Sequence, residues 1–282
     1  MTVPILPSRR LWRRLKRHPQ IFIGGAIAVV FVLLAVTPSF FVEYAPLASE
    51  VRQRLQGPSA EHPFGTDRIG RDVLSRVVHG SRISLTVGFV STLIAGIVGG
   101  SLGVVAAYYR GATDLILSRI MDILFSFPAL ILAITLAAAL GAGARNAIIA
   151  IAVVYTPLFF RIVRAPVLAL VQTEFVEAGR ALGVRDARMM ALHVVPNALS
   201  PFLVEVPLTL SRAILTESYL SFLGLGVQPP TPSWGSSLAE GITMLERAPW
   251  LSIYPGIAIV LAVIAFNLIG DALRDLTDPN AR

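Results

Sequence analysis

The chain has 282 residues, of which 55% are hydrophobic and 15% are charged, with a formal net charge of +7 at pH 7. This composition is too apolar for an ordinary soluble domain and predicts a protein that lies in a lipid bilayer. In such a protein the basic excess belongs to loops beside the membrane, so the charge gives no support to nucleic-acid binding. The sequence contains no cysteine, which excludes disulfides and thiolate metal sites.

The N-terminal residues 1–20 contain five Arg and one Lys but no acidic residue, and an apolar run follows them directly. Because basic segments stay on the cytoplasmic side, we expect residues 1–20 in the cytoplasm and the first transmembrane helix over residues 21–42. A cleaved signal peptide of the twin-arginine type is the alternative. Against it, the apolar run extends beyond Pro38 and has no small-residue cleavage site.

Residues 43–82 are polar and should form an external segment before the second span. Its core is a motif of turn formers and charged residues: Gly65, Thr66, Asp67, Gly70, Arg71 and Asp72. A short helix should follow, on which Asp72 and Arg76 lie one turn apart and can pair. His62 with Asp67 and Asp72 would allow a metal site. One histidine beside carboxylates and several arginines is, however, more typical of a hydrogen-bonded structural cluster.

Residues 83–272 are apolar enough for a transmembrane core of five helices. We expect these at about residues 83–108, 115–140, 147–164, 199–224 and 252–271. The first carries two rows of small residues four apart, which let helices approach closely. In the next span Arg119 and Asp122 should pair with each other, and Pro128 should kink the helix. Pro157 should bend the span after that, which is short.

Residues 174–197, between the fourth and fifth spans, are the most polar part of the core. The pattern predicts two short helices joined at Gly183, which can take a left-handed conformation, and Pro196 should end the second helix or start the next. Each helix has an apolar face beside charged residues, formed by Phe175, Ala178 and Leu182 in the first and by Met189, Leu192 and Val195 in the second. An amphipathic elbow of this kind suits docking into a groove of another protein.

Glu217 is a carboxylate inside the fifth span. Because a charge in the membrane is costly, its side chain should face protein or a water-filled pathway rather than lipid. Two interpretations stay open. Glu217 forms, with Ser221 and Phe222, a gate that meets the ammonium group of a substrate, or it is a hydrogen-bond partner between helices.

The external loop 225–251 carries apolar residues at near-helical spacing from Trp234 to Leu245. This stripe predicts a short helix at the outer membrane interface, anchored by Trp234 and Trp250. The sixth span then returns to a cytoplasmic tail, residues 273–282.

The polar elbow resembles the signature loop of the permease subunits of ATP-binding-cassette importers. The residues that carry this resemblance are Glu177-Ala178-Gly179, Gly183 and Val194-Val195-Pro196. Gly179 stands where the pattern has a second alanine, and Val195 stands where it has leucine. The motif from Gly65 to Asp72 and the run 216–235 resemble the dipeptide, oligopeptide and nickel subfamily, in particular its C-type permease.

The resemblance implies an all-α integral membrane protein with the type I importer permease fold, six transmembrane helices and cytoplasmic termini. It also implies that the elbow couples to an ATPase through Glu174, Glu177, Ala178, Gly179, Leu182, Gly183, Asp186, Met189, His193 and Pro196. The implied partners are a homologous second permease, two ATP-binding-cassette ATPase subunits and an external substrate-binding protein, in a bacterial cytoplasmic (inner) membrane. The implied substrate is a dipeptide or oligopeptide, with nickel, glutathione or opines as alternatives.

The sequence has no motif for catalysis by the chain itself. It lacks the Gly-x-x-x-x-Gly-Lys-Ser/Thr loop, so ATP and Mg²⁺ should bind to the partner subunits and no cofactor or metal to this chain. It also lacks the His-Glu-x-x-His arrangement of a metalloprotease. We therefore predict a transport subunit rather than an enzyme. The alternative class is a secondary transporter that works without ATPases, which would usually show internal repeats, and we find no convincing repeat.

Overall fold

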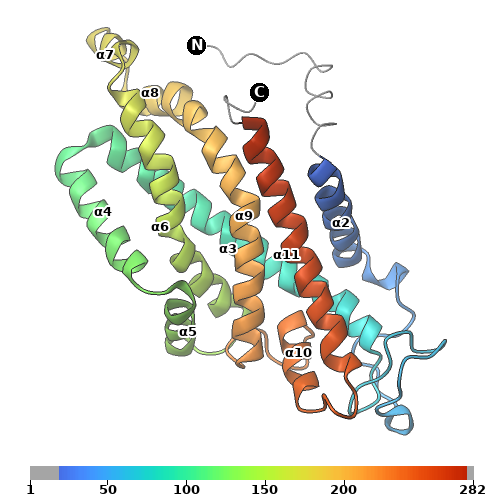
Figure 1. The fold of residues 1–282 in the computed structure, drawn as a ribbon. Helices are drawn as coiled ribbons and strands as arrows, with labels where there is room; N and C mark the ends of the chain where they lie inside the picture. Colours follow the sequence, from blue (N-terminus) through green and yellow to red (C-terminus); the bar gives the residue numbers. More distant parts are fainter. Residues whose placement is uncertain (1–18, 278–282) are drawn as a thin grey trace.

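The computed structural model describes residues 19–277, and within that range the regular structure is helical apart from one β-bridge between Thr66 and Asp72 (Figure 1). The helices are α2 (Pro19–Val36), α3 (Val73–Tyr109), α4 (Gly111–Ser126), α5 (Ala129–Leu140), α6 (Ala144–Val171), α7 (Glu174–Ala181), α8 (Asp186–Met189), α9 (Val195–Phe222), α10 (Trp234–Ile242) and α11 (Trp250–Thr277). Shorter turns are the 3-10 helices Pro38–Phe40 and Val51–Gln53 and the π-helix Met190–Val194. The predicted all-α class is confirmed.

The number of spans agrees with the prediction. Five helices of the described range are long and apolar enough to cross a membrane, and the pair α4 and α5 makes a sixth if it is counted as one bent span. These two helices are bent by 94° at the break between them. Pro128 lies in that break, and proline both lacks an N–H and disfavours helix at the residue before it. The predicted kink is therefore confirmed as a full break.

The predicted limits of the first and fourth spans are wrong. α2 ends before position 42 because Pro38 takes Thr37 out of the helical conformation, with φ −124° and ψ 52°. α6 is 28 residues long rather than short, and Pro157 and Pro166 lie in its interior. Proline is tolerated inside a membrane helix because neighbouring groups satisfy the backbone that it leaves unpaired.

The second and sixth spans are also longer than predicted. α3 begins ten residues before position 83 because Asp72 caps it, with Oδ2 accepting a 2.6 Å hydrogen bond from the backbone N–H of Ser75. The external segment therefore ends at 72 instead of 82. α11 exceeds 252–271 at both ends, so the predicted tail 273–282 begins as helix. The rest of that tail, like residues 1–18, lies outside the described residues.

α3 is the packing centre of the molecule and passes behind α6, α9 and α11 (Figure 1). Its two rows of small residues lie against different neighbours. A Cβ atom at Gly103 would lie 2.6 Å from the carbonyl oxygen of Phe160 on α6, and one at Gly88 would lie 2.7 Å from Ile214 on α9. The rows therefore allow the close approach that the sequence predicts.

The carboxylates of α4 pair with α6 and not within their own helix. Asp122 binds Arg161 at 2.7 Å, and Asp114 binds Arg164 through two contacts of 2.6 and 2.7 Å. The predicted pair of Arg119 with Asp122 is therefore wrong. The reason is tertiary, because α4 folds back beside α6 and brings arginines of that helix into reach.

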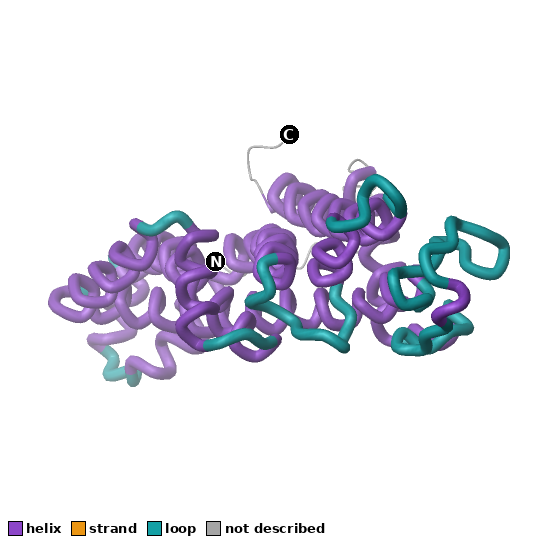
Figure 2. Tube along the Cα trace, turned by 90° about the horizontal axis from the view of Figure 1, so that it is seen from below, coloured by secondary structure: helices purple, strands orange, loops and turns teal. Residues whose placement is uncertain are grey.

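The helices form a layer that is much broader than it is deep, seen from below in Figure 2. α7 and α8 lie at one end of this layer, and α5 and α10 lie at the opposite end (Figure 1). α10 confirms the predicted short helix, but the prediction that Trp234 anchors it at the membrane interface is wrong. Trp234 is fully buried, donates from Nε1 to the carbonyl oxygen of Val77 at 2.9 Å and meets the ring of Phe31.

Candidate functional site

The elbow, residues 174–197, lies at the end of the molecule opposite α5 and α10 (Figure 1). α7 follows α6, and the chain leaves the helix two residues after Ala181 at Gly183, which is left-handed with φ +74°. The N–H of Val184 then donates back to the carbonyl oxygen of Gly179 at 3.0 Å, which is the 6→1 bond of a Schellman motif. The predicted role of Gly183 in joining the two helices is confirmed.

Of the two roles predicted for Pro196, the start of the next helix is confirmed, because Pro196 lies in the first turn of α9. α8 passes through the π-helix Met190–Val194 into α9, and this whole stretch qualifies as one 37-residue span. Pro196 has no N–H for the carbonyl oxygen of Leu192, and its ring crowds that group. The wider π turn accommodates the proline without breaking the chain of helix. The elbow is therefore joined directly to the fifth span.

Three large apolar side chains of the elbow are exposed: Phe175 at 45%, Leu182 at 83% and Leu192 at 57%. Met189, predicted on the same docking face, is instead buried at 2%. It packs against Gly179, where an added Cβ atom would overlap the Met189 methyl group. This contact explains why glycine stands where the signature pattern has alanine.

A buried cluster ties the elbow to three spans. Its elbow members are Val176, Met189 and Val194, and it continues with Val104, Ala107 and Tyr108 of α3, Val163, Val167 and Val171 of α6 and Ala198 of α9. The hydroxyl of Tyr108 also donates to Oδ1 of Asp186 at 2.6 Å. The elbow is thereby packed against α3, α6 and α9 together.

The remaining predicted coupling residues are exposed, apart from half-buried Gly179. Glu174 and Glu177 lie exposed in the first turn of α7, where negative charge complements the helix dipole. His193 is exposed and lies edge-on to the ring of Phe175, with ring centroids 6.0 Å apart. Ala178 and Pro196 are exposed as well. The elbow thus combines acidic and apolar groups on one protruding surface.

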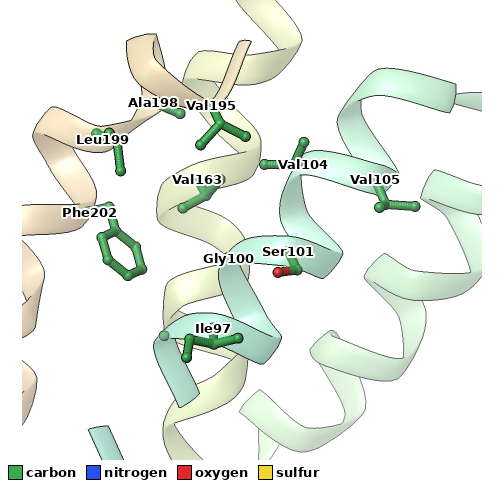
Figure 3. Close-up of a pocket in the computed structure, with 11 residues that line it drawn as sticks. Ile97, Gly100, Ser101, Val104, Val105, Val163, Val195, Ala198, Leu199 and Phe202 are labelled. Carbon is green, nitrogen blue, oxygen red and sulfur yellow. The ribbon is translucent and has the colours of Figure 1, made fainter. Parts of the chain in front are cut away.

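An apolar cavity of about 330 Å³ lies below the elbow between α3, α6 and α9. Figure 3 shows Val195, Ala198, Leu199 and Phe202 on one side and Ile97, Gly100, Ser101, Val104 and Val105 across from them, with Val163 between. Ser101 contributes the one side-chain hydroxyl in this lining. The cavity suits an apolar group rather than a charged substrate.

The external motif forms a buried hydrogen-bonded cluster at the other end of the molecule. Asp67 accepts from the backbone N–H groups of Ile69 and Arg71 at 3.0 Å each and binds the Arg71 Nε atom. His62 binds Oδ1 of Asp72 through Nδ1 at 3.0 Å. These bonds favour the structural interpretation of the motif over a metal site.

Glu240 of α10 closes this cluster. Its two carboxylate oxygens bind Arg71 at 2.8 Å and Arg76 at 3.0 Å. The predicted pair of Asp72 with Arg76 is therefore wrong, because Asp72 caps α3 while Arg76 reaches across to α10. The link to Glu240 is not visible in the sequence, since the two partners are more than 160 residues apart.

Two residues of the motif hold close backbone contacts. Gly65 has φ +73°, and a Cβ atom there would lie 2.8 Å from Nε1 of Trp250. Gly70 has φ +81°, and its added Cβ would overlap the carbonyl group of Glu50. Trp250 in turn donates from Nε1 to the carbonyl oxygen of Thr66 at 3.2 Å. The motif thereby joins the external segment to the start of α11.

Glu217 has no exposed surface, and its Oε1 accepts a 2.7 Å hydrogen bond from Ser221. Ser221 is buried too, and its hydroxyl accepts from the N–H of Val227 at 3.0 Å. Phe222 is half-buried at the end of α9. This enclosed position favours the packing interpretation of Glu217 over a gate on a pathway.

Comparisons with known proteins agree with this architecture. Residues 99–282 match the family described as "Binding-protein-dependent transport system inner membrane component", and residues 7–58 match "N-terminal TM domain of oligopeptide transport permease C". The chain is 42% identical to the dipeptide transport system permease protein DppC of Alkalihalophilus pseudofirmus, over 99% of this chain and 91% of that protein.

Two further relatives are similar over almost the whole chain. A putative peptide transport system permease protein of Brucella abortus is 44% identical, over 96% of this chain and 91% of the relative. The glutathione transport system permease protein GsiD of Pectobacterium atrosepticum is 40% identical, over 98% of this chain and 92% of the relative.

A structure of the MetNI methionine ABC transporter in an inward-facing conformation has a similar fold. The TM-score is 0.58 at 20% identity, with 72% of this chain and 96% of that chain covered. Together with the five to six apolar spans of the described residues, these matches describe a transport permease of the membrane. The chain belongs to the family of inner membrane components of binding-protein-dependent transport systems and has the fold of an ATP-binding-cassette importer permease.

Proposed function

We propose that this chain and a homologous second permease form the membrane pathway of an ATP-driven importer of small peptides. Relatives described as dipeptide, peptide and glutathione permeases, each covering nearly the whole chain, support a peptide substrate. Glutathione is the substrate alternative. An external binding protein delivers the peptide, and two ATPase subunits hold the ATP and Mg²⁺.

The observation that carries this proposal is the elbow. It presents Phe175, Leu182 and Leu192 outward, while its inner face is fixed to α3, α6 and α9 by one buried cluster. Exposed apolar groups rimmed by charge are the usual mark of a docking surface. Closure of the ATPase dimer around the elbow would displace it, and the cluster would pass this displacement to the spans that enclose the pathway.

The proposed orientation follows from the same feature. The first residues of α2 and the last residues of α11 lie on the elbow side of the molecule, which we assign to the cytoplasm (Figure 1). The external cluster and α10 then face outward. The binding protein would dock on the surface formed by residues 57–82 and 227–250.

The test is capture of the ATPase subunits by the complex in mild detergent, followed by an ATPase assay with loaded binding protein. Leu182→Asp places a charge on the elbow and should lower both capture and stimulated hydrolysis by about tenfold or more, as expected for a central interface residue. Leu47→Asp is the matched control, because Leu47 is an exposed leucine at 51% in the external segment. It should leave capture unchanged.

Two results would contradict the proposal. Normal capture and stimulation in Leu182→Asp would show that the elbow is not the docking surface. Peptide uptake by the chain alone in liposomes, driven by an ion gradient and without ATPases, would instead identify a secondary transporter.

A further inference from the structure

Two ion pairs lie on the outer surface of the subunit within its membrane-spanning helices. Asp122 and Arg161 have side chains about half exposed, at 52% and 46%, and Arg212 is exposed at 49% beside Glu205 at 12%. A charge that faces lipid at the bilayer centre costs about 2.5–3.5 kcal/mol or more. The surface that carries these pairs is therefore covered by protein or water.

Arg212 lies well inside a helix that is long and apolar enough to span a membrane. It stands seventeen residues after Val195, the first residue of α9, and ten before Phe222, the last. At 1.5 Å per residue these separations are about 26 Å and about 15 Å. Because these separations exceed the length of an arginine side chain, the guanidinium group does not easily reach either end of α9.

The Glu205–Arg212 pair lies between two hollows on the surface of α9. Arg212 lines a hollow of about 210 Å³ with Tyr155 and Leu158 of α6 and residues of the α4–α5 break. Glu205 lines another, of about 520 Å³, with Arg274 of α11. α4, α6, α9 and α11 lie side by side in this order (Figure 1). The pair thus separates an outer hollow from an inner one.

Arg212 and Glu205 are joined by a single hydrogen bond, so another charged ligand can replace this contact. Nη1 of Arg212 donates to Oε1 of Glu205 at 2.8 Å, and the same oxygen accepts from Thr209 at 3.0 Å. A guanidinium group has five N–H donors and a carboxylate has two oxygens, so both groups keep capacity for a second partner. Arg212 presents that capacity to the hollow that it lines.

We propose that Arg212 and Glu205 form a charge-exchange site for a zwitterionic peptide on its way through the membrane. Arg212 binds the terminal carboxylate of the peptide and Glu205 its terminal ammonium group, so that substrate replaces the internal ion pair. The site has one charge of each sign, and each charge lines a hollow of its own, which suits a dipolar ligand. This inference rests on the proposed function.

The first experiment exchanges the two charges in the complete transporter, with partner subunits and binding protein in proteoliposomes. The single variants Arg212→Gln and Glu205→Gln should lower peptide uptake per assembled complex by about tenfold, equivalent to about 1.4 kcal/mol. Arg212→Lys should keep most uptake, because the contact uses one N–H. The double variant Glu205→Arg with Arg212→Glu restores an ion pair but reverses its order. It should assemble and still transport poorly.

Full uptake by this double variant would overturn the inference, since the pair would then serve packing alone. Peptide uptake by the unmodified complex distinguishes failure of the proposed function from failure of the charge-exchange site. If it takes up no peptide, the proposed function fails. If it takes up peptide and the reversed pair does so equally well, only the charge-exchange site fails.

A second experiment keeps Arg212 and Glu205 unchanged. It tests the site even if the complex with the reversed ion pair does not assemble. The chain has no cysteine, so single cysteines can be introduced directly. Leu158→Cys lies in the hollow beside Arg212, and Val260→Cys, on an exposed apolar stretch of α11, is the control. A membrane-impermeant methanethiosulfonate reagent should modify position 158 but not 260, and excess dipeptide should slow the reaction. No reaction at 158, or no effect of dipeptide there, would overturn the inference.

Discussion

Replacing Gly183 with valine tests the elbow most sharply. Gly183 has φ +74°, and no atom lies within 4 Å of an added Cβ, so the substitution introduces backbone strain without a clash. A left-handed conformation costs an L-residue about 1–2 kcal/mol, and a branched Cβ makes this worse. Such a cost lowers the population of the native elbow by about 5- to 30-fold relative to a rearranged one. Binding-protein-stimulated ATP hydrolysis should fall accordingly.

The assay compares stimulated hydrolysis of the purified complex with the amount of chain in the membrane. Membrane insertion should be unchanged, because Gly183 lies outside the spans. Gly183→Asn is the matched control, since asparagine adds a side chain but tolerates the left-handed conformation. It should keep most of the stimulation. Equal and normal stimulation in both variants would refute the argument that the Schellman turn positions the elbow.

Three further variants test other contacts. Tyr108→Phe removes the donor to Asp186 and should lower the peptide transported per ATP hydrolysed while assembly stays normal; an unchanged ratio would show that the bond has no part in coupling. Glu217→Leu removes the acceptor of the buried Ser221 hydroxyl and should destabilise the subunit by about 1–3 kcal/mol, seen as a lower melting temperature in detergent. A loss of transport at unchanged melting temperature would instead support the gate interpretation. Gly103→Leu should reduce the folded protein recovered from membranes, because a Cβ there would already lie 2.6 Å from the carbonyl oxygen of Phe160; Gly25→Leu, which meets open space, should not, and equal recovery would contradict the packing of α3 on α6.

Features set by neighbours in sequence were predictable. Gly183 follows a short amphipathic helix, and Pro128 interrupts an apolar run, so local backbone rules lead directly to a turn and a break. The rows of small residues on α3 likewise predict close packing, although they do not identify the partner helix. Apolar length alone identifies the spans, although it places their ends poorly when a cap such as Asp72 extends them.

Features set by distant neighbours were not predictable. Asp122 and Arg119 are close in sequence, but the partner of Asp122 is Arg161, which α4 meets only after the chain folds back. Met189 has the spacing of a docking residue, and its burial depends on the gap that Gly179 leaves. Hydrophobic periodicity reports which residues share a face, and it does not report whether that face meets the same subunit or another one.

The continuity of helix from Asp186 to Phe222 has a geometric consequence. These 37 residues form one stretch with one end in the elbow and the other beside α10. At 1.5 Å per residue the stretch is about 55 Å long, so a tilt of about 10° around one end moves the other by about 10 Å. In the proposed importer, a small displacement of the elbow by the ATPase would therefore become a displacement of about 10 Å at the opposite end of the fifth span.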